Sequence, residues 1–187
     1  MRSKKIRLIV VRHGETPANL SGLVVGRSED RLTANGREQM TKIRQTLKNY
    51  TPFLAVYASP MERCVESVQL VAPEYDPIYD GRLAERELGD LRNYRIDELW
   101  QNPLWNSLEV ERTSAGAETL LAGLLRTQDF LNDLKAKYPT GGTVLLVTHS
   151  FISRCLWILT ENITDPAQMS DFLHPNSEIR QYKYNIV

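Results

Sequence analysis

Three polar segments directly follow apolar runs, and their side chains are suited to binding an anion. The segments are RHG at 12–14, SPMER at 59–63 and THS at 148–150. They supply guanidinium groups and imidazole rings, whose charge-assisted hydrogen bonds are about twice as strong as neutral ones. Together with backbone N–H groups at helix N-termini, such groups suit a tetrahedral oxyanion such as phosphate. The candidate ligands are Arg12, His13, Arg63 and His149.

The apolar runs before these segments predict buried strands that bring the polar ends together. The runs cover residues 6–11, 53–58 and 144–147, are rich in β-branched side chains and are flanked by polar turns. Runs of this length and composition are typical of parallel-sheet strands covered on both faces. In open α/β sheets, ligands bind outside the carboxyl ends of the strands. We therefore expect the three polar ends to meet and form the floor of a site.

Helical patterns lie between the expected strands. Thr33 is suited to cap one helix, and SPME at 59–62 is a capping-box pattern with proline at the first helical position. Recurring leucines predict a long amphipathic helix over 118–138, and Ser150 is suited to cap a further helix over 151–159. Strand and helix therefore alternate along most of the chain.

This alternation predicts an α/β fold, a three-layer α/β/α sandwich with a mostly parallel central sheet. The tail at 179–187 alternates enough to add a late strand. The segment 94–113 carries two tryptophans and few strand signals, and we expect it to be a small helical lid insertion over the active site. No repeat or low-complexity linker divides the sequence, so residues 1–187 are expected to form a single domain.

The composition excludes some classes of partner. The 187 residues carry 23 Lys and Arg against 23 Asp and Glu, a formal net charge of zero. No bulk electrostatic attraction is therefore available for nucleic acid or an anionic membrane surface, and a small-molecule partner is expected.

Cys64 and Cys155 make no disulfide framework in a chain of this length. No apolar stretch is long enough to span a bilayer, and a cytoplasmic location is expected, while oligomeric state stays open.

Six motifs follow one another in a characteristic order. They are RHGET from Arg12, GRSEDRLTANGREQ from Gly26, SPMER from Ser59, RLAERELGDL from Arg82, GAET from Gly116 and VTHS from Val147. This order resembles the histidine phosphatase superfamily, which includes the cofactor-dependent phosphoglycerate mutases. The resemblance covers about residues 6–160 and implies an enzyme that transfers phosphoryl groups.

The resemblance implies a role for each candidate ligand. His13 would be the nucleophile that takes the phosphoryl group on a ring nitrogen, and Arg12, Arg63 and His149 would complete the phosphate pocket. An imidazole must be neutral to attack phosphorus, and neighbouring cations lower its pKa. The two arginines would thus favour the reactive ring while they bind the dianion. This chemistry needs positioning and charge stabilisation, so no metal or other cofactor is expected.

Two further roles come from the resemblance. Glu85 matches the family's proton donor to the leaving alcohol, and Asn19 matches a residue that contacts the phosphate. Glu87 and Asp90 lie close to Glu85 in the sequence, and either could serve as the donor while Glu85 pairs with Arg82 or Arg86. The sequence leaves the identity of the donor open.

The sequence departs from the family pattern at two places. Ser150 stands directly after His149, where many relatives have glycine, and it could cap the following helix or contact the phosphate. Leu91, Arg92 and Asn93 stand where relatives often show Trp-Glu-Gly. The second departure lies beside the proton donor and bears on substrate preference, whereas the phosphate pocket is untouched.

The leading functional hypothesis is a phosphatase that hydrolyses a small phosphorylated metabolite through phosphohistidine, with Glu85 protonating the leaving oxygen. Phosphoglycerate mutase-type transfer is the alternative, but mutases of this family carry a larger insertion after the donor. Only about 30 residues separate Glu85 from Gly116 here. A non-catalytic phosphate-binding module is the third hypothesis, disfavoured because a binder needs neither a nucleophile nor an acid.

Other polar and aromatic residues are expected to lie outside the chemistry. His174, in HPN near the end, is predicted to be a surface residue, while Asn176 and Ser177 are candidates to border the pocket mouth. Trp100 and Trp105 are predicted to anchor helix packing. The two cysteines are predicted to fill the core.

Overall fold

A computed structural model describes residues 4–100, 116–165, 168–169 and 172–186, which fold around a five-stranded sheet with the strand order β3-β2-β4-β1-β5. The strands are β1 (Lys5–Arg12), β2 (Ala55–Ala58), β3 (Ile78–Tyr79), β4 (Gly142–Thr148) and β5 (Ile179–Asn185). Strand pairs β1–β4, β2–β4 and β2–β3 are parallel, whereas β5 runs antiparallel to β1. The predicted mostly parallel sheet and late strand are confirmed.

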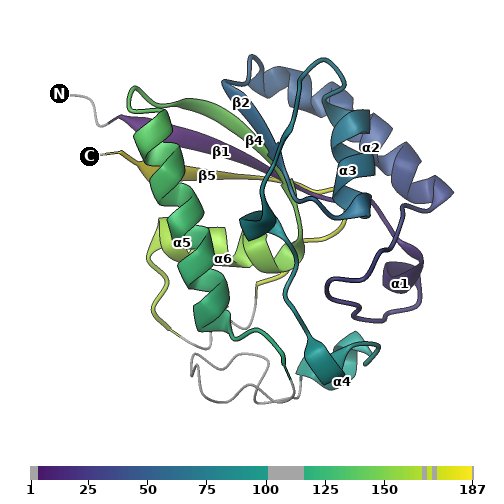
Figure 1. Ribbon diagram of the computed structural model, residues 1–187. Coiled ribbons are helices and arrows are strands. Elements are labelled where there is room, and N and C mark those ends of the chain that lie inside the picture. Colours follow the sequence, from purple (N-terminus) through teal and green to yellow (C-terminus); the bar gives the residue numbers. More distant parts are fainter. Residues whose placement is uncertain (1–3, 101–115, 166–167, 170–171, 187) are drawn as a thin grey trace.

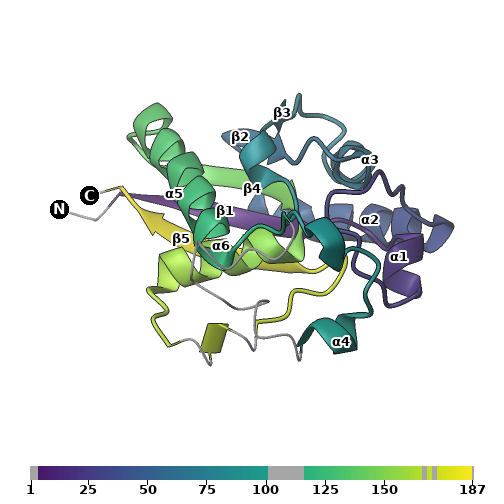
Figure 2. The same cartoon turned by 60° about the horizontal axis from the view of Figure 1, so that its bottom comes forward.

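Helices cover both faces of the sheet and complete three layers, as Figures 1 and 2 show. On one face lie α2 (Ala34–Leu47) and α3 (Glu62–Val71), and on the other lie α5 (Leu120–Lys137) and α6 (Ser150–Glu161). The shorter elements are α1 (Pro17–Leu20), α4 (Ile96–Trp100) and the 3₁₀ turns Lys48–Tyr50, Gly81–Leu83 and Gly89–Leu91. The predicted α/β/α sandwich is confirmed.

The two faces of β1 explain its almost wholly apolar sequence. Leu8 and Val10 belong to the core under α5 and α6, whereas Ile9 and Val11 belong to the core under α2 and α3. All four side chains are fully buried. Because successive side chains of a strand point to opposite faces, a strand covered on both sides has no polar face. Lys5 and Arg7 lie in the first half of the strand, the run from Leu8 to Val11 is apolar, and the sequence becomes polar again at Arg12, where the strand ends.

The helix caps follow the predictions in part. The Thr33 side chain accepts a backbone hydrogen bond and caps α2 as expected. The predicted capping box at Ser59 is wrong, because Ser59 Oγ lies against the His149 ring and α3 begins only at Glu62. Ser150 is the first residue of α6 and not its cap, a position that His149 takes. At Ser59, therefore, the side chain contacts a residue from another strand end instead of capping α3.

The segment 94–113 begins with the short helix α4. The chain enters this segment by pairing with an earlier loop, since the N–H of Val24 donates to Tyr94 O and the N–H of Ile96 donates to Gly22 O. Residues 101–113, including Trp105, lie outside the described residues, so the lid stays a prediction. Among the helices that the structure describes, none combines the length and the apolar character needed to cross a membrane.

Candidate active site

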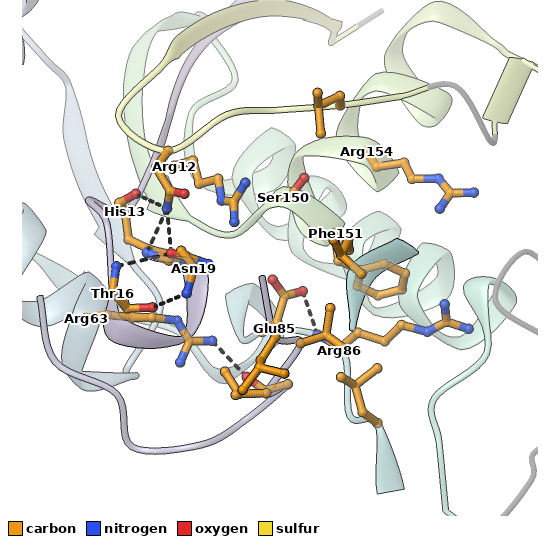
Figure 3. Close-up of a pocket in the computed structure, with 18 of the residues that line it drawn as sticks. Arg12, His13, Thr16, Asn19, Arg63, Glu85, Arg86, Ser150, Phe151 and Arg154 are labelled. Atoms are coloured by element: carbon orange, nitrogen blue, oxygen red, sulfur yellow. Dashed lines mark hydrogen bonds between the residues drawn. The ribbon is translucent and has the colours of Figure 1, made fainter. Parts of the chain in front are cut away.

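The carboxyl ends of β1, β2 and β4 meet at one cavity of about 290 Å³ (Figure 3). Arg12 ends β1, Arg63 lies in the first turn of α3 after β2, and His149 follows β4. The predicted site residues that line the cavity are Arg12, His13, Asn19, Arg63, Glu85 and Ser150. His149 is fully buried, and its ring packs against that of His13, which lines the cavity. The structure therefore brings together the polar strand ends that the sequence indicated.

A hydrogen bond to backbone fixes the tautomer of His13. Its Nδ1 lies 2.8 Å from the carbonyl oxygen of Gly14, and because that oxygen can only accept, Nδ1 carries the hydrogen. Asn176 Nδ2 lies 3.5 Å from the same nitrogen, but two donors do not bond, and the amide donates to His13 O at 3.0 Å instead. Among the described residues, Nε2 has no hydrogen-bond partner. The lone pair for attack is therefore on Nε2.

The surroundings of His13 keep this ring neutral. The residue is 3% exposed. Burial lowers its pKa well below the ordinary value of 6.5, and the charges of Arg63 and Arg12 lower it further. At pH 7 the ring is thus an uncharged imidazole, the form that acts as a nucleophile.

Backbone carbonyls hold both arginines of the phosphate end in place. Arg12 Nη1 donates to His174 O at 2.7 Å, and Arg63 donates from Nη2 to Gly26 O at 2.8 Å and from Nη1 to Ser28 O at 2.9 Å. Gly26 has a φ of +55°, and a Cβ there would come within 2.9 Å of a backbone oxygen. Only glycine fits this loop without strain, so the loop that orients Arg63 depends on it.

His149 packs against the nucleophile as a second buried imidazole. Its ring centroid lies 5.2 Å from that of His13 in an edge-to-face arrangement. Its Nε2 lies 2.8 Å from Ser59 Oγ, and its Nδ1 lies 3.9 Å from Glu85 Oε2. Burial lowers the pKa of His149 well below 6.5, with Arg63 as the next cause. His149 is therefore also neutral at pH 7 and contacts both His13 and Glu85.

The structure distinguishes the two glutamates that the sequence left open. Glu85 lines the cavity, and its Oε1 accepts a hydrogen bond from the Arg86 amide at 2.8 Å. Glu87 is not among the lining residues, and its Oε1 accepts from the Leu88 amide at 3.0 Å and from Arg92 Nε at 3.1 Å. Partial burial acts to raise the pKa of Glu87, but these bonds lower it overall. Of the two carboxylates, only Glu85 is placed to reach a ligand.

The last loop of the chain corrects one prediction. His174 is fully buried, not on the surface, and its ring nitrogens lie 2.6 Å from Ser153 Oγ and 3.0 Å from Glu178 O. Asn176 lines the cavity and donates to Asn19 Oδ1 at 3.0 Å. Sequence reasoning placed Asn176 at the pocket mouth but gave no sign that His174 anchors this loop.

The end of the cavity away from His13 was missed by sequence reasoning. Arg86, Phe151 and Arg154 line it, and both arginines are only 4% exposed. Arg154 lies one helical turn after Ser150 on α6, and that spacing could have placed it near the site. Arg86 carried no comparable signal.

Thiols and metals contribute no candidate group. Cys64 and Cys155 are free and buried, as predicted, and burial raises the pKa of each thiol to about 12. Such thiols stay protonated and unreactive at pH 7. Within the described residues, no cluster of three or more His, Cys, Asp or Glu side chains is arranged to hold a metal ion.

Comparisons with known proteins agree with this geometry. Residues 8–185 match the family model of the histidine phosphatase superfamily (branch 1). A relative from Enterobacter sp. (strain 638), "Probable phosphoglycerate mutase GpmB", is 30% identical over 159 residues, which is 81% of this chain and 73% of the relative.

Solved structures share the fold at lower identity. "Mycobacterial hydrolase 1" superposes with a TM-score of 0.83 at 20% identity, covering 96% of this chain and 91% of that chain. A phosphoserine phosphatase from Entamoeba histolytica, solved in complex with 3-phosphoglyceric acid, gives a TM-score of 0.79 at 21% identity, with 96% and 94% covered.

Proposed function

The chain belongs to the histidine phosphatase superfamily, and from this premise we propose that it hydrolyses phosphate monoesters of small metabolites through a phosphohistidine on His13. One observation carries the proposal. The Nε2 of a neutral His13, which has no hydrogen-bond partner among the residues that the structure describes, shares a cavity with two guanidinium groups that backbone carbonyls already orient. Preorganised charge of this kind stabilises a transferring phosphoryl group without reorganisation during the reaction.

In the first proposed step, His13 Nε2 forms a bond to phosphorus as the ester P–O bond breaks. Arg12 and Arg63 hold the phosphoryl oxygens, and Asn19 adds a polar contact at the cavity wall. Glu85, protonated in this step, gives its proton to the leaving oxygen, which departs as an alcohol. The Nδ1–H bond to Gly14 O stabilises the positive charge that forms on the ring.

In the second proposed step, water replaces the alcohol. The Glu85 carboxylate takes a proton from water, whose oxygen bonds to phosphorus as the P–Nε2 bond breaks. Inorganic phosphate leaves, and His13 and protonated Glu85 are restored. None of these bond changes requires a metal, so activity should persist in excess EDTA. We further propose a cytoplasmic location, which the two free, buried cysteines support because thiols stay reduced there.

Mutase-type transfer is a second candidate because the relative from Enterobacter carries that name and aligns with 81% of this chain. In a mutase, the phosphoryl group on His13 would return to another hydroxyl of the substrate instead of to water. The two reactions share the first step and differ only in the acceptor.

Rapid-quench labelling tests the shared step. Brief exposure to a ³²P-labelled phosphate monoester should leave acid-labile, base-stable label on the peptide that contains His13, and His13→Ala should abolish both label and turnover. Turnover without this label would remove the nucleophile assignment. Binding of phosphate with neither label nor turnover would instead support the non-catalytic module.

Product analysis separates hydrolysis from mutase chemistry. The protein is incubated with 3-phosphoglycerate and 2,3-bisphosphoglycerate, and both 2-phosphoglycerate and inorganic phosphate are measured. Hydrolysis predicts that inorganic phosphate accumulates. Accumulation of 2-phosphoglycerate without phosphate release would assign the mutase reaction.

A further inference from the structure

The GAET motif at 116–119 has no part in the proposed reaction, yet its glutamate binds two arginines. Glu118 is not among the described residues that line the cavity, and its side chain is 10% exposed. Its Oε1 accepts from Arg126 Nε at 2.6 Å, and its Oε2 accepts from Arg126 Nη2 at 2.9 Å. Oε2 also accepts from Arg27 Nη2 at 3.4 Å. One carboxylate therefore orients both guanidinium groups.

Both of these arginines also bind the backbone of the proposed proton donor. Arg27 Nε donates to Glu85 O at 2.8 Å, and Arg126 Nη2 donates to the same oxygen at 3.3 Å. A guanidinium group has five N–H donors in a fixed planar arrangement, so each arginine can bind the carboxylate and the carbonyl together. Glu118 is thus linked to Glu85 through two side chains.

The residues after Glu85 are bound to Glu118 directly. The N–H of Glu118 donates to Glu87 O at 2.7 Å, and the N–H of Glu87 donates to Glu118 Oε2 at 3.2 Å. Arg86 Nε donates to Glu118 O at 2.6 Å. One residue further on, Leu88 and Ala117 form an antiparallel bridge. The segment 85–88 is therefore held along its whole length by Glu118 and its neighbour.

These contacts supply a fixed backbone that the sheet does not give to Glu85. Glu85 follows the 3₁₀ turn Gly81–Leu83 and lies outside the five strands. Its carboxylate lines the cavity, and Figure 3 shows it extending toward the side where Arg12 and Asn19 lie. A group that transfers a proton must lie within about 2.6–3.2 Å of its acceptor. Contacts that hold residues 85–88 bear on that distance without touching the ligand.

We propose that Glu118 is a positioning residue for proton transfer: by holding residues 85–88, it keeps the Glu85 carboxyl group within reach of the leaving oxygen. This inference rests on the proposed function, in which Glu85 donates that proton. A displacement of about 1 Å at a reacting group can lower a rate about 10²-fold. Loss of the Glu118 carboxylate should therefore slow the departure of alcohols that need a proton.

Glu118→Gln tests this role with little change in side-chain size. Both carboxylate oxygens accept from Arg126, so the amide nitrogen of glutamine meets a donor whichever way it lies. We expect kcat/KM for an alkyl phosphate such as n-butyl phosphate to fall about 10-fold to 10²-fold. For p-nitrophenyl phosphate, whose phenolate leaves with little protonation, the fall should be less than about threefold. The constant kcat/KM is chosen because it covers the steps through phosphoryl transfer to His13 and not the later hydrolysis.

Glu66→Gln is the matched control. Glu66 lies on α3, is 17% exposed and also pairs with two arginines, Arg37 at 2.9 Å and Arg31 at 3.9 Å. It makes no contact with residues 85–88 among those that the structure describes. Any loss of kcat/KM in this variant should be equal for the two esters, so their ratio should stay as in the wild type.

A double variant shows whether Glu118 acts through Glu85. Once Glu85→Gln has removed the proton, the position of residue 85 matters little for the departing alcohol. Adding Glu118→Gln to Glu85→Gln should therefore lower kcat/KM for the alkyl phosphate by less than about threefold. A purely structural effect of Glu118 would instead cost the same factor in both backgrounds, because independent effects add.

Arg27→Met gives a second test if Glu118→Gln does not fold. The Arg27 side chain is 38% exposed, and the substitution removes one of the two side-chain donors to Glu85 O. The ratio of kcat/KM between the two esters should shift in the same direction as in Glu118→Gln, by about threefold to tenfold. An unchanged ratio in Arg27→Met would contradict the inference.

The outcomes separate this inference from the proposed function. Equal losses on both esters in folded Glu118→Gln, or the full loss repeated in the Glu85→Gln background, would overturn the positioning role. Phosphate release by the wild type and label on His13 would leave the phosphatase intact in either case. Absence of phosphate release from both esters in the wild type would overturn the proposed function itself.

Discussion

The two ends of the catalytic cavity are built in different ways. At the end proposed to bind phosphate, Arg12 and His13 lie at the end of β1, Arg63 lies in the first turn of α3, and backbone carbonyls hold all three side chains. The leaving-group end is the end of the cavity away from His13, lined by Arg86, Phe151 and Arg154. Its lining residues come from loops and helix faces, and one of them, Leu173, is 58% exposed. The first end is fixed by the sheet, while the second depends on segments outside it.

This difference separates what performs the chemistry from what selects the substrate. Phosphoryl transfer requires a nucleophile and cations within a fraction of an ångström of the productive geometry, and the rigid sheet supplies that. Selection of the alcohol requires only a complementary wall, which loops can vary without moving the nucleophile. Substitutions at the two ends should therefore have different kinetic signatures.

Glu85 lies where the two ends meet, and its substitution should have the largest effect. Glu85→Gln removes the proton for the leaving oxygen and should lower kcat for alkyl phosphates about 10²-fold to 10⁴-fold. The loss should be much smaller for p-nitrophenyl phosphate, whose phenolate leaves with little protonation. Steady-state kinetics on both esters measures the difference.

Glu87→Gln is the matched control for this prediction. Its carboxylate accepts from backbone amides and from Arg92 and does not line the cavity. In this control, the ratio of kcat between the two esters should change by less than about threefold, because the substituted side chain does not reach the cavity. Equal losses on both esters in Glu85→Gln would remove the donor assignment.

Arg63 tests the phosphate end alone. Arg63→Met should lower kcat/KM about 10²-fold to 10³-fold for every phosphate monoester, whatever its alcohol. Because Arg63 is the leading charge that lowers the pKa of His13 after burial, that pKa should also rise toward 6.5 in the variant. The acid limb of the kcat/KM profile should move to higher pH. A loss confined to esters of one kind of alcohol would contradict the division between the two ends.

Gly36 packs closely against the backbone of the loop that follows His13. A Cβ at Gly36 would lie 2.2 Å from the backbone oxygen of Glu15, and one at Gly14 would lie 2.5 Å from that of Gly36. Gly36→Ala should therefore lower the free energy of unfolding by about 1–3 kcal/mol and displace the loop after His13. Urea denaturation measures the loss, and Gly81→Ala is the control, since a Cβ there meets nothing within 4 Å. Equal stability of the two variants would show that the loop does not rest on Gly36.

The buried histidines predict that the stability of the protein depends on pH. The pKa values of His13 and His149 are lowered well below 6.5 and that of His174 to about 4, in each case mainly by burial. Between pH 6.5 and 5 the unfolded chain therefore binds protons that the folded protein does not. The free energy of unfolding should fall with falling pH, by up to about 1.4 kcal/mol per pH unit for each histidine.

Urea denaturation at several pH values measures that slope. His174→Gln removes one of the three titrating rings and should give a shallower slope than the wild type. An unchanged slope would mean that His174 binds its proton over the same pH range in the folded and unfolded states, so that burial does not lower its pKa.

The sequence was sufficient for the phosphate end because strand ends follow a simple rule. A run such as 6–11, apolar on both faces, must lie inside the sheet, and its polar continuation must lie at the edge where parallel strands end. Arg12, His13 and Arg63 follow from this rule alone. Local patterns were less reliable where a side chain had a competing partner. Ser59 matches a capping residue in sequence but contacts His149 in the fold.

The leaving-group end could not be derived in the same way. Arg86 lies in a loop whose path depends on contacts with Glu118 and with α6, and no periodicity fixes it. The polar sequence around His174 is typical of a surface loop. In the fold, however, the His174 carbonyl oxygen accepts a hydrogen bond from Arg12, and the loop lies against the site. Such contacts join positions far apart in the sequence and appear only in three dimensions.

The antiparallel pairing of β5 has a practical consequence. Lys5 lies directly opposite Asn185, so the first and last strands begin and end side by side, at the opposite end of β1 from Arg12 (Figure 1). Eight residues of strand span roughly 26 Å, so this corner is remote from His13. An affinity tag or surface tether attached there would leave the cavity open to solution, and a short peptide joining the two ends would permit circularly permuted forms.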